Sequence, residues 1–136
     1  MTEIKKLTKI AILAYGAVSL IFGILLFFFT EMFIASLNMP TWQNPAHPRM
    51  FGAALFIVVI YALLILLKKD LEWENIHVAF IVMFSWLPLN ILAEVVTLTI
   101  YGPTLSFQVI SQGILDIIIM SALFVLNLIA YIKQRA

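Results

Sequence analysis

Residues 51–67 read FGAALFIVVIYALLILL, and no side chain in this stretch carries a charge. A helix needs about 20 mostly apolar residues to cross the hydrocarbon core of a bilayer, which is roughly 30 Å thick. The stretch reaches that length when the preceding Arg49 and Met50 are included, and Lys68 and Lys69 end it. The sequence therefore predicts a transmembrane helix over residues 49–67.

Three other segments have the same apolar character. They cover residues 8–29, 75–100 and 105–132, and the last two are long enough to tilt or to emerge from the bilayer. We therefore predict an all-α integral membrane protein with a single domain over residues 1–136. Its expected architecture is an up-and-down bundle of four transmembrane helices.

The composition supports a membrane protein and excludes several other classes. The chain is 64% hydrophobic and 11% charged, with a mean hydropathy of +1.11, whereas a soluble domain is about half apolar and about a quarter charged. There is no cysteine, so disulfides, cysteine-ligated metals and thiol chemistry are excluded. A net charge of +1 gives no electrostatic footprint for nucleic acid.

The segments between the predicted helices differ in character. Residues 30–48 read TEMFIASLNMPTWQNPAHP. We expect their apolar part, residues 32–37, to lie in the membrane interface or to prolong the first helix, and the prolines at 40, 45 and 48 to prevent a helix. Residues 68–75, KKDLEWEN, form a short charged loop. Residues 101–104, YGPT, form a tight turn, so the last two helices make an antiparallel hairpin.

The distribution of basic residues predicts the orientation in the membrane. Arg49 is the one basic residue on its side of the predicted bundle. The other seven all fall on the opposite side: Lys5, Lys6, Lys9, Lys68, Lys69, Lys133 and Arg135. Cytoplasmic segments carry the excess of lysine and arginine. We therefore predict a multi-pass protein of the cell (inner, cytoplasmic) membrane with both termini in the cytoplasm (N-in/C-in).

Polar residues inside the apolar helices form a candidate site. Asp116 lies about 16 Å along the last helix, at 1.5 Å per residue, and so near the middle of the bilayer. Gln108 and Gln112 precede it on the same face, and Asn90 and Glu94 are likewise four residues apart on the third helix. When residues are counted outward from the YGPT turn along both helices, the polar face of the third helix lies level with that of the last helix. We therefore expect the two faces to meet in the outer half of the bilayer.

Arg49 is expected to lean inward toward Glu94 and to complete this polar cluster. One arginine with two carboxylates leaves one negative charge, which a proton on Asp116, a bound cation or a partner's basic residue would cancel. Three interpretations stay open. In the first, the internal-glue interpretation, the cluster holds the helices together and a protonated Asp116 is hydrogen-bonded to Asn90 or Gln112. In the second, the cluster is a pocket for a ligand, a proton or a cation. In the third, it pairs with a partner subunit.

No catalytic residues are predicted, and no metal site. The two histidines, His47 and His77, fall on opposite sides of the membrane, so they cannot ligate one ion together. His47 with the outer carboxylates Glu31 and Glu94 is an alternative, but we interpret His47, in the sequence PAHP, as a solvated loop residue. We interpret two sets of small residues as helix-packing surfaces. One set consists of Gly16, Ser19 and Gly23, and the other of Gly52 and its neighbouring alanines.

The stretch from Asn44 to Asn75 resembles a pattern in the DoxX-like and related uncharacterised families of small four-helix prokaryotic membrane proteins. Their second helix opens with an Arg-x-x-Gly unit, as at Arg49, and a basic-Asp-x-x-x-x-Asn turn follows it, as at Lys69–Asn75. Their last helix carries an aspartate before an apolar run, as at Asp116. The chain departs from the pattern in its third helix, where His77 stands in place of a basic residue. The resemblance implies a four-helix bundle and, for some members, a subunit that meets quinones.

Two functions are therefore expected. The first is a non-enzymatic membrane protein that acts by binding, as an accessory or assembly subunit or as a lipid-binding bundle. The second is a quinone-linked or proton-handling subunit that uses Asn90, Glu94, Gln112 and Asp116. The expected partners are the lipid bilayer and other membrane subunits or further copies of the chain. The only cofactor-like ligands expected are a quinone or a lipid.

Overall fold

The structure is a computed structural model that describes residues 2–38, 46–68 and 70–136. Four long helices make up most of it: α1 (Lys6–Phe28), α3 (Ala46–Leu67), α4 (Trp73–Tyr101) and α5 (Phe107–Arg135). The short helix α2 (Thr30–Ser36) follows α1, and the 3-10 helix η1 (Gly102–Thr104) joins α4 to α5. All four long helices are long and apolar enough to cross a membrane. The chain is therefore a helical membrane protein with four candidate spans.

The helices begin and end within a few residues of the predicted positions, with two differences. The chain breaks at Phe29, where φ is −114° and ψ is 30°, and residues 30–36 form a separate helix instead of prolonging α1. Pro48 was expected in a loop, but it lies in the first turn of α3. This expectation was wrong because a first-turn N–H has no partner within the helix, so proline costs nothing there. Pro40 and Pro45 lie outside the described residues.

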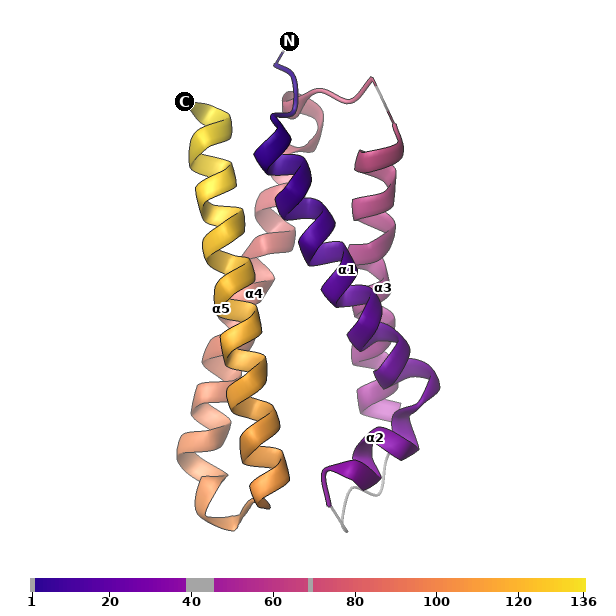
Figure 1. The fold of residues 1–136 in the computed structure, drawn as a ribbon, viewed down its shortest axis with the longest axis vertical. Helices are drawn as coiled ribbons and strands as arrows, with labels where there is room; N and C mark the ends of the chain where they lie inside the picture. The colour runs from indigo at the N-terminus through magenta and orange to yellow at the C-terminus, as the bar shows by residue number, and fades with distance from the viewer. Residues whose placement is uncertain (1, 39–45, 69) are drawn as a thin grey trace.

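The four long helices form two pairs, α1 with α3 and α4 with α5 (Figure 1). Both termini and the connection from α3 to α4 lie at one end, which we call the terminal end. Helix α2 and η1 lie at the other end, which we call the turn end (Figure 1). Helix α1 approaches α4 and α5 at the terminal end and diverges from them toward the turn end (Figure 1).

Close contact between backbones holds α1 to α3. A Cβ atom at Gly52 would lie 2.9 Å from the backbone N of Phe27 and 3.2 Å from the carbonyl oxygen of Gly23. A Cβ atom at Gly16 would lie 2.6 Å from the Cβ of Ala62. In lipid, where no hydrophobic force drives helices together, such small residues permit the van der Waals contact that does. The prediction that these glycines are packing surfaces is confirmed.

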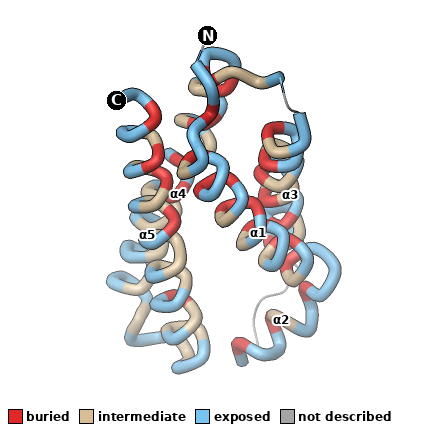
Figure 2. Tube along the Cα trace, turned by 45° about the horizontal axis from the view of Figure 1, so that its top comes forward, coloured by how far each residue is buried: buried red, intermediate tan, exposed pale blue. Residues whose placement is uncertain are grey.

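Aromatic side chains fill the terminal half of the α4–α5 pair. Trp73 packs on Phe80 with ring centroids 5.5 Å apart, and Tyr131 stacks on Phe80 at 6.5 Å and contacts Phe84 at 6.0 Å. Beyond Leu87 no described residue of α4 is buried, and the burial of α5 is also concentrated toward its C-terminal half (Figure 2). The packed core therefore belongs to the terminal half of the molecule.

A set of hydrogen bonds, which we call the terminal clasp, ties residues 2–5 to both helices of the α4–α5 pair. The buried Gln134 of α5 accepts from the backbone N of Lys5 at 2.7 Å and from Thr8 Oγ1 at 2.8 Å, and its Nε2 donates to the carbonyl of Glu3 at 2.9 Å. At the start of α4, Trp73 N donates to the carbonyl of Thr2 at 2.9 Å. The clasp therefore fixes where the two pairs meet.

Substituting Gly52 by alanine tests the α1–α3 contact. The added Cβ meets backbone atoms, which cannot rotate away, so we expect the free energy of unfolding to fall by about 1–3 kcal/mol. Gly102→Ala is the matched control, because nothing lies within 4 Å of a Cβ at Gly102. Thermal unfolding in a mild detergent measures both. Equal melting temperatures for the two variants would contradict the packing described here.

Candidate functional site

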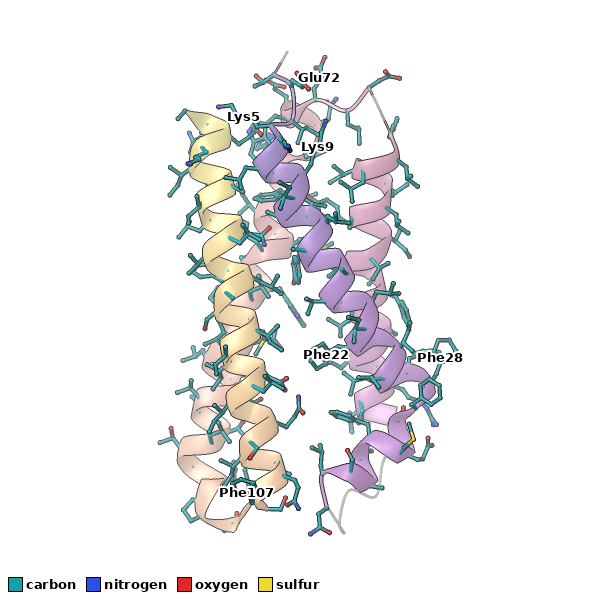
Figure 3. All side chains as sticks on the ribbon, in the orientation of Figure 1. Lys5, Lys9, Phe22, Phe28, Glu72 and Phe107 are labelled. Carbon is teal, nitrogen blue, oxygen red and sulfur yellow. The ribbon has the colours of Figure 1, made fainter. Side chains whose placement is uncertain are left out.

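A cavity of about 410 Å³ lies between the two helix pairs in the turn half of the molecule. Its volume falls in the range of about 300–1,000 Å³ that small-molecule sites occupy. The wall is mostly apolar and aromatic, and Phe22 projects from the side of α1 that faces the other pair (Figure 3). Other apolar lining residues include Tyr15, Leu26, Leu55, Trp86 and Leu123. The cavity exists because the pairs diverge beyond their packed core.

Individual contacts between the two helix pairs mark the limits of the cavity. Toward the terminal end, the Tyr15 hydroxyl of α1 donates to the carbonyl of Met83 on α4 at 3.2 Å. At the turn end, Ser106 Oγ donates to the carbonyl of Leu37, just after α2, at 2.8 Å and accepts from the N–H of Val109. Between α3 and α4, the rings of Phe51 and Trp86 stack with centroids 6.4 Å apart.

The polar part of the wall comes from α4 and α5. Asn90 and Glu94 of α4 line the cavity together with Gln112 and Asp116 of α5. Gln112 Nε2 donates to Asp116 Oδ1 at 2.7 Å, as expected for amide and carboxylate groups four residues apart on a helix. The structure therefore brings together four of the six residues that the sequence pointed to.

The position of Glu94 depends on a glycine of the facing helix. Its Oε1 lies where a side chain at Gly113 would start, and the side chain of Leu98 flanks the same spot. Gly113 is buried, while Glu94 and Asp116 are half-buried. Because Gly113 has no side chain, the Glu94 carboxylate fits between α4 and α5, at the level of the Gln112–Asp116 pair.

Asn90 does not bond Asp116. Its Nδ2 donates to the carbonyl of Trp86 on its own helix at 2.7 Å. Pro88 lies in this turn and cannot donate to the carbonyl of Phe84, as proline has no N–H. Of the two partners proposed for Asp116 in the internal-glue interpretation, the structure pairs it with Gln112.

Arg49 lies outside the cluster, contrary to expectation. Its guanidinium pairs with Glu31 of α2, and 41% and 64% of the two side chains are exposed. The pKa of the Glu31 carboxyl is lowered by a hydrogen bond to its own backbone N–H and then by Arg49. Glu31 lies in the first turn of α2 and Arg49 in the first turn of α3, and the two side chains meet at the turn end. The described lining of the cavity therefore contains carboxylates and no basic side chain.

Gln108 is also separate from the cluster. It is exposed in the first turn of α5 and does not line the cavity. The regular spacing of Gln108, Gln112 and Asp116 placed all three on one face, but in the structure Gln112 and Asp116 line the cavity and Gln108 does not.

Ser19 is a cavity residue that the sequence did not single out. It is 2% exposed, it lines the cavity from α1, and its Oγ has no hydrogen-bond partner in the described structure. An unpaired buried hydroxyl is costly. The only signal in the sequence was its place between Gly16 and Gly23, which indicates helix packing as readily as a site.

Neither histidine joins the cavity. His47 is exposed in the first turn of α3, and His77 lies in α4 with its Nδ1 2.9 Å from the carbonyl oxygen of Glu74. Within residues 2–38, 46–68 and 70–136, no three histidine or carboxylate side chains are grouped to hold a metal ion.

Comparison with known proteins found no matching family model, no matching curated protein and no matching solved structure. The resemblance to DoxX-like proteins therefore stays a prediction. The site is interpreted from its own geometry alone.

Removing the Ser19 hydroxyl tests whether it is unpaired. We expect Ser19→Ala to raise the free energy of unfolding of the ligand-free, delipidated protein by roughly 1–3 kcal/mol, because the variant no longer buries an unpaired polar group. Ser85→Ala is the control, since Ser85 is exposed and donates to the carbonyl of Val82, and it should change stability by less than about 0.5 kcal/mol. A destabilised Ser19→Ala variant would show that the hydroxyl has a partner within the protein.

Proposed function

We propose that the protein is an up-and-down bundle of four transmembrane helices in the cell (inner, cytoplasmic) membrane, with both termini in the cytoplasm. The arrangement of the ends supports this orientation. Lys5 and Lys9 lie at the terminal end (Figure 3), and Lys133 and Arg135 lie in the last turn of α5 at the same end. At the turn end, the described basic residue is Arg49, which is paired with Glu31.

Single cysteines test this orientation cleanly, because the chain has no cysteine of its own. We expect Thr104→Cys in η1 to react in intact cells with a maleimide that cannot cross membranes. Asp70→Cys, at the terminal end, should react only after the membrane is permeabilised. Both positions are exposed, so reactivity reports sidedness. The reverse labelling pattern would overturn the orientation.

We further propose that the protein acts by binding, not by catalysis, and takes an amphiphilic molecule or a lipid from the bilayer into its cavity. The observation that carries this proposal is the 410 Å³ cavity with apolar walls and one polar side. Such walls with a few convergent polar groups are typical of ligand sites. This role fits an accessory or assembly subunit that presents or shields its ligand.

The chemistry of the lining supports binding over catalysis. Ser19 is the one hydroxyl of the described structure that is buried, unpaired and in the lining, and no histidine lines the cavity to activate it. The carboxyl of Asp116 is held by an amide, Gln112, which can orient it but cannot exchange a proton with it.

Filling the cavity tests the proposal. Ala93 lines the cavity from α4, so Ala93→Phe should abolish copurification of a small molecule that native mass spectrometry finds on the wild type. Ala79→Phe is the matched control: the same substitution on the same helix, at an exposed position outside the cavity, should keep the molecule. A bare wild-type protein, or a ligand retained by Ala93→Phe, would contradict the proposal.

The second candidate is a quinone-linked or proton-handling subunit. The observation that favours it is that the lining combines Gln112, a hydrogen-bond donor, with the carboxyl of Asp116 next to an apolar path. This candidate agrees with the proposed membership of the DoxX-like families. The mass released from the wild type decides between the two, because a quinone has a characteristic mass.

A further inference from the structure

The charge of the cavity lining indicates which ligands it can accept. Glu94 and Asp116 are the ionisable carboxyl groups of the lining, and no lysine, arginine or histidine of the described structure accompanies them. Arg49, the basic residue that the sequence led us to expect in the cluster, is engaged by Glu31. Two carboxylates in an apolar environment are stable only if a proton or a cation compensates them.

The carboxyl groups also have free hydrogen-bonding capacity. Asp116 Oδ1 accepts from Gln112, and within the described residues its second oxygen and both oxygens of Glu94 accept from no donor. An ionised carboxylate only accepts hydrogen bonds, so it needs donors from its ligand. A ligand with N–H donors and a positive charge fits both requirements.

Ser19 belongs to the opposite wall of the cavity. Ser19 of α1 is almost completely buried, its Oγ has no partner, and it lines the same cavity. Buried polar groups are normally hydrogen-bonded. Because the Oγ atom is itself buried and closed off from the cavity, Ser19 offers no hydrogen-bonding group to a ligand head, and recognition of the head falls to the carboxylates.

The remaining walls favour the same class of ligand. Tyr15, Phe22 and Trp86 present aromatic rings to the cavity, and aromatic faces attract cations as well as apolar groups. An anionic head would be repelled by the carboxylates. A purely apolar ligand would leave the charges of both carboxylates uncompensated.

We propose that the cavity binds a lipophilic amine, with its protonated nitrogen beside Asp116 and Glu94 and its apolar body against the aromatic wall. This inference rests on the proposed binding function and narrows it to one class of ligand. The volume of about 410 Å³ admits an amine with one aromatic ring and a short alkyl chain, but not a whole two-chain lipid.

Three compounds with one skeleton and different heads test the inference: 4-phenylbutylamine, 4-phenylbutanol and 4-phenylbutyrate. Native mass spectrometry of the detergent-solubilised protein, titrated at pH 7, gives the dissociation constant of each. We expect the amine to bind at least about tenfold more tightly than the alcohol, and the acid not to bind measurably.

Variants test whether the preference for the amine arises in the cavity. Asp116→Asn and Glu94→Gln should each weaken amine binding by about tenfold, while alcohol binding stays within about threefold and so shows that the fold is intact. Glu31→Gln is the matched control, because Glu31 is a carboxylate outside the cavity, and it should leave amine binding unchanged.

The possible failures are distinguishable. If the alcohol binds as tightly as the amine and Ala93→Phe abolishes both, the cavity binds neutral ligands, so the binding function holds and the amine inference is overturned. If amine binding survives both Asp116→Asn and Glu94→Gln, the carboxylates do not recognise the head and the inference also fails. If none of the compounds binds, and nothing copurifies with the wild type, both proposals fail.

Discussion

The structure depends on the requirement that backbone polar groups inside a bilayer find hydrogen-bond partners within the protein. In this chain the requirement produces four long helices, whose association must then come from close packing and polar contacts, because lipid is as apolar as the helix surfaces. Each contact type has its own place in the described structure. Gly52 meets the backbone of α1, aromatic rings fill the terminal half of α4 and α5, and Gln134 ties the N-terminal segment to α5.

These contacts are unevenly distributed, and the cavity is the consequence. The terminal half combines the clasp with the aromatic core, whereas the turn half is bridged by the Ser106–Leu37 hydrogen bond and the stack of Phe51 on Trp86. Regions with few buried contacts are the ones that open most easily, and ligand-binding regions are drawn from them. The molecule therefore has a firmly packed end and a more loosely packed end that contains the cavity.

A contribution to stability does not by itself explain the polar side chains of the cavity. Glu94, Asp116 and the unpaired Ser19 each cost free energy in an apolar site, and the cation that would offset the carboxylates, Arg49, pairs with Glu31 instead. Proteins commonly retain such destabilising groups where binding requires them. The internal-glue interpretation explains the Gln112–Asp116 bond, but it gives no role to Ser19 or to the open volume beside it.

The sequence by itself determined the four apolar helices, their approximate ends and the placement of Gln112 and Asp116 on one helix face, because hydropathy and helical spacing are local properties. Only the tertiary structure decided that Arg49 reaches Glu31, that Gln108 is excluded and that Ser19 faces a cavity. The physical reason is that a helix face turned to lipid and one turned to an apolar cavity have the same composition. The rotation and divergence of the helices, which distinguish these faces, follow from contacts such as Gly52 with α1 and Glu94 with Gly113 that form only when all the helices are packed together.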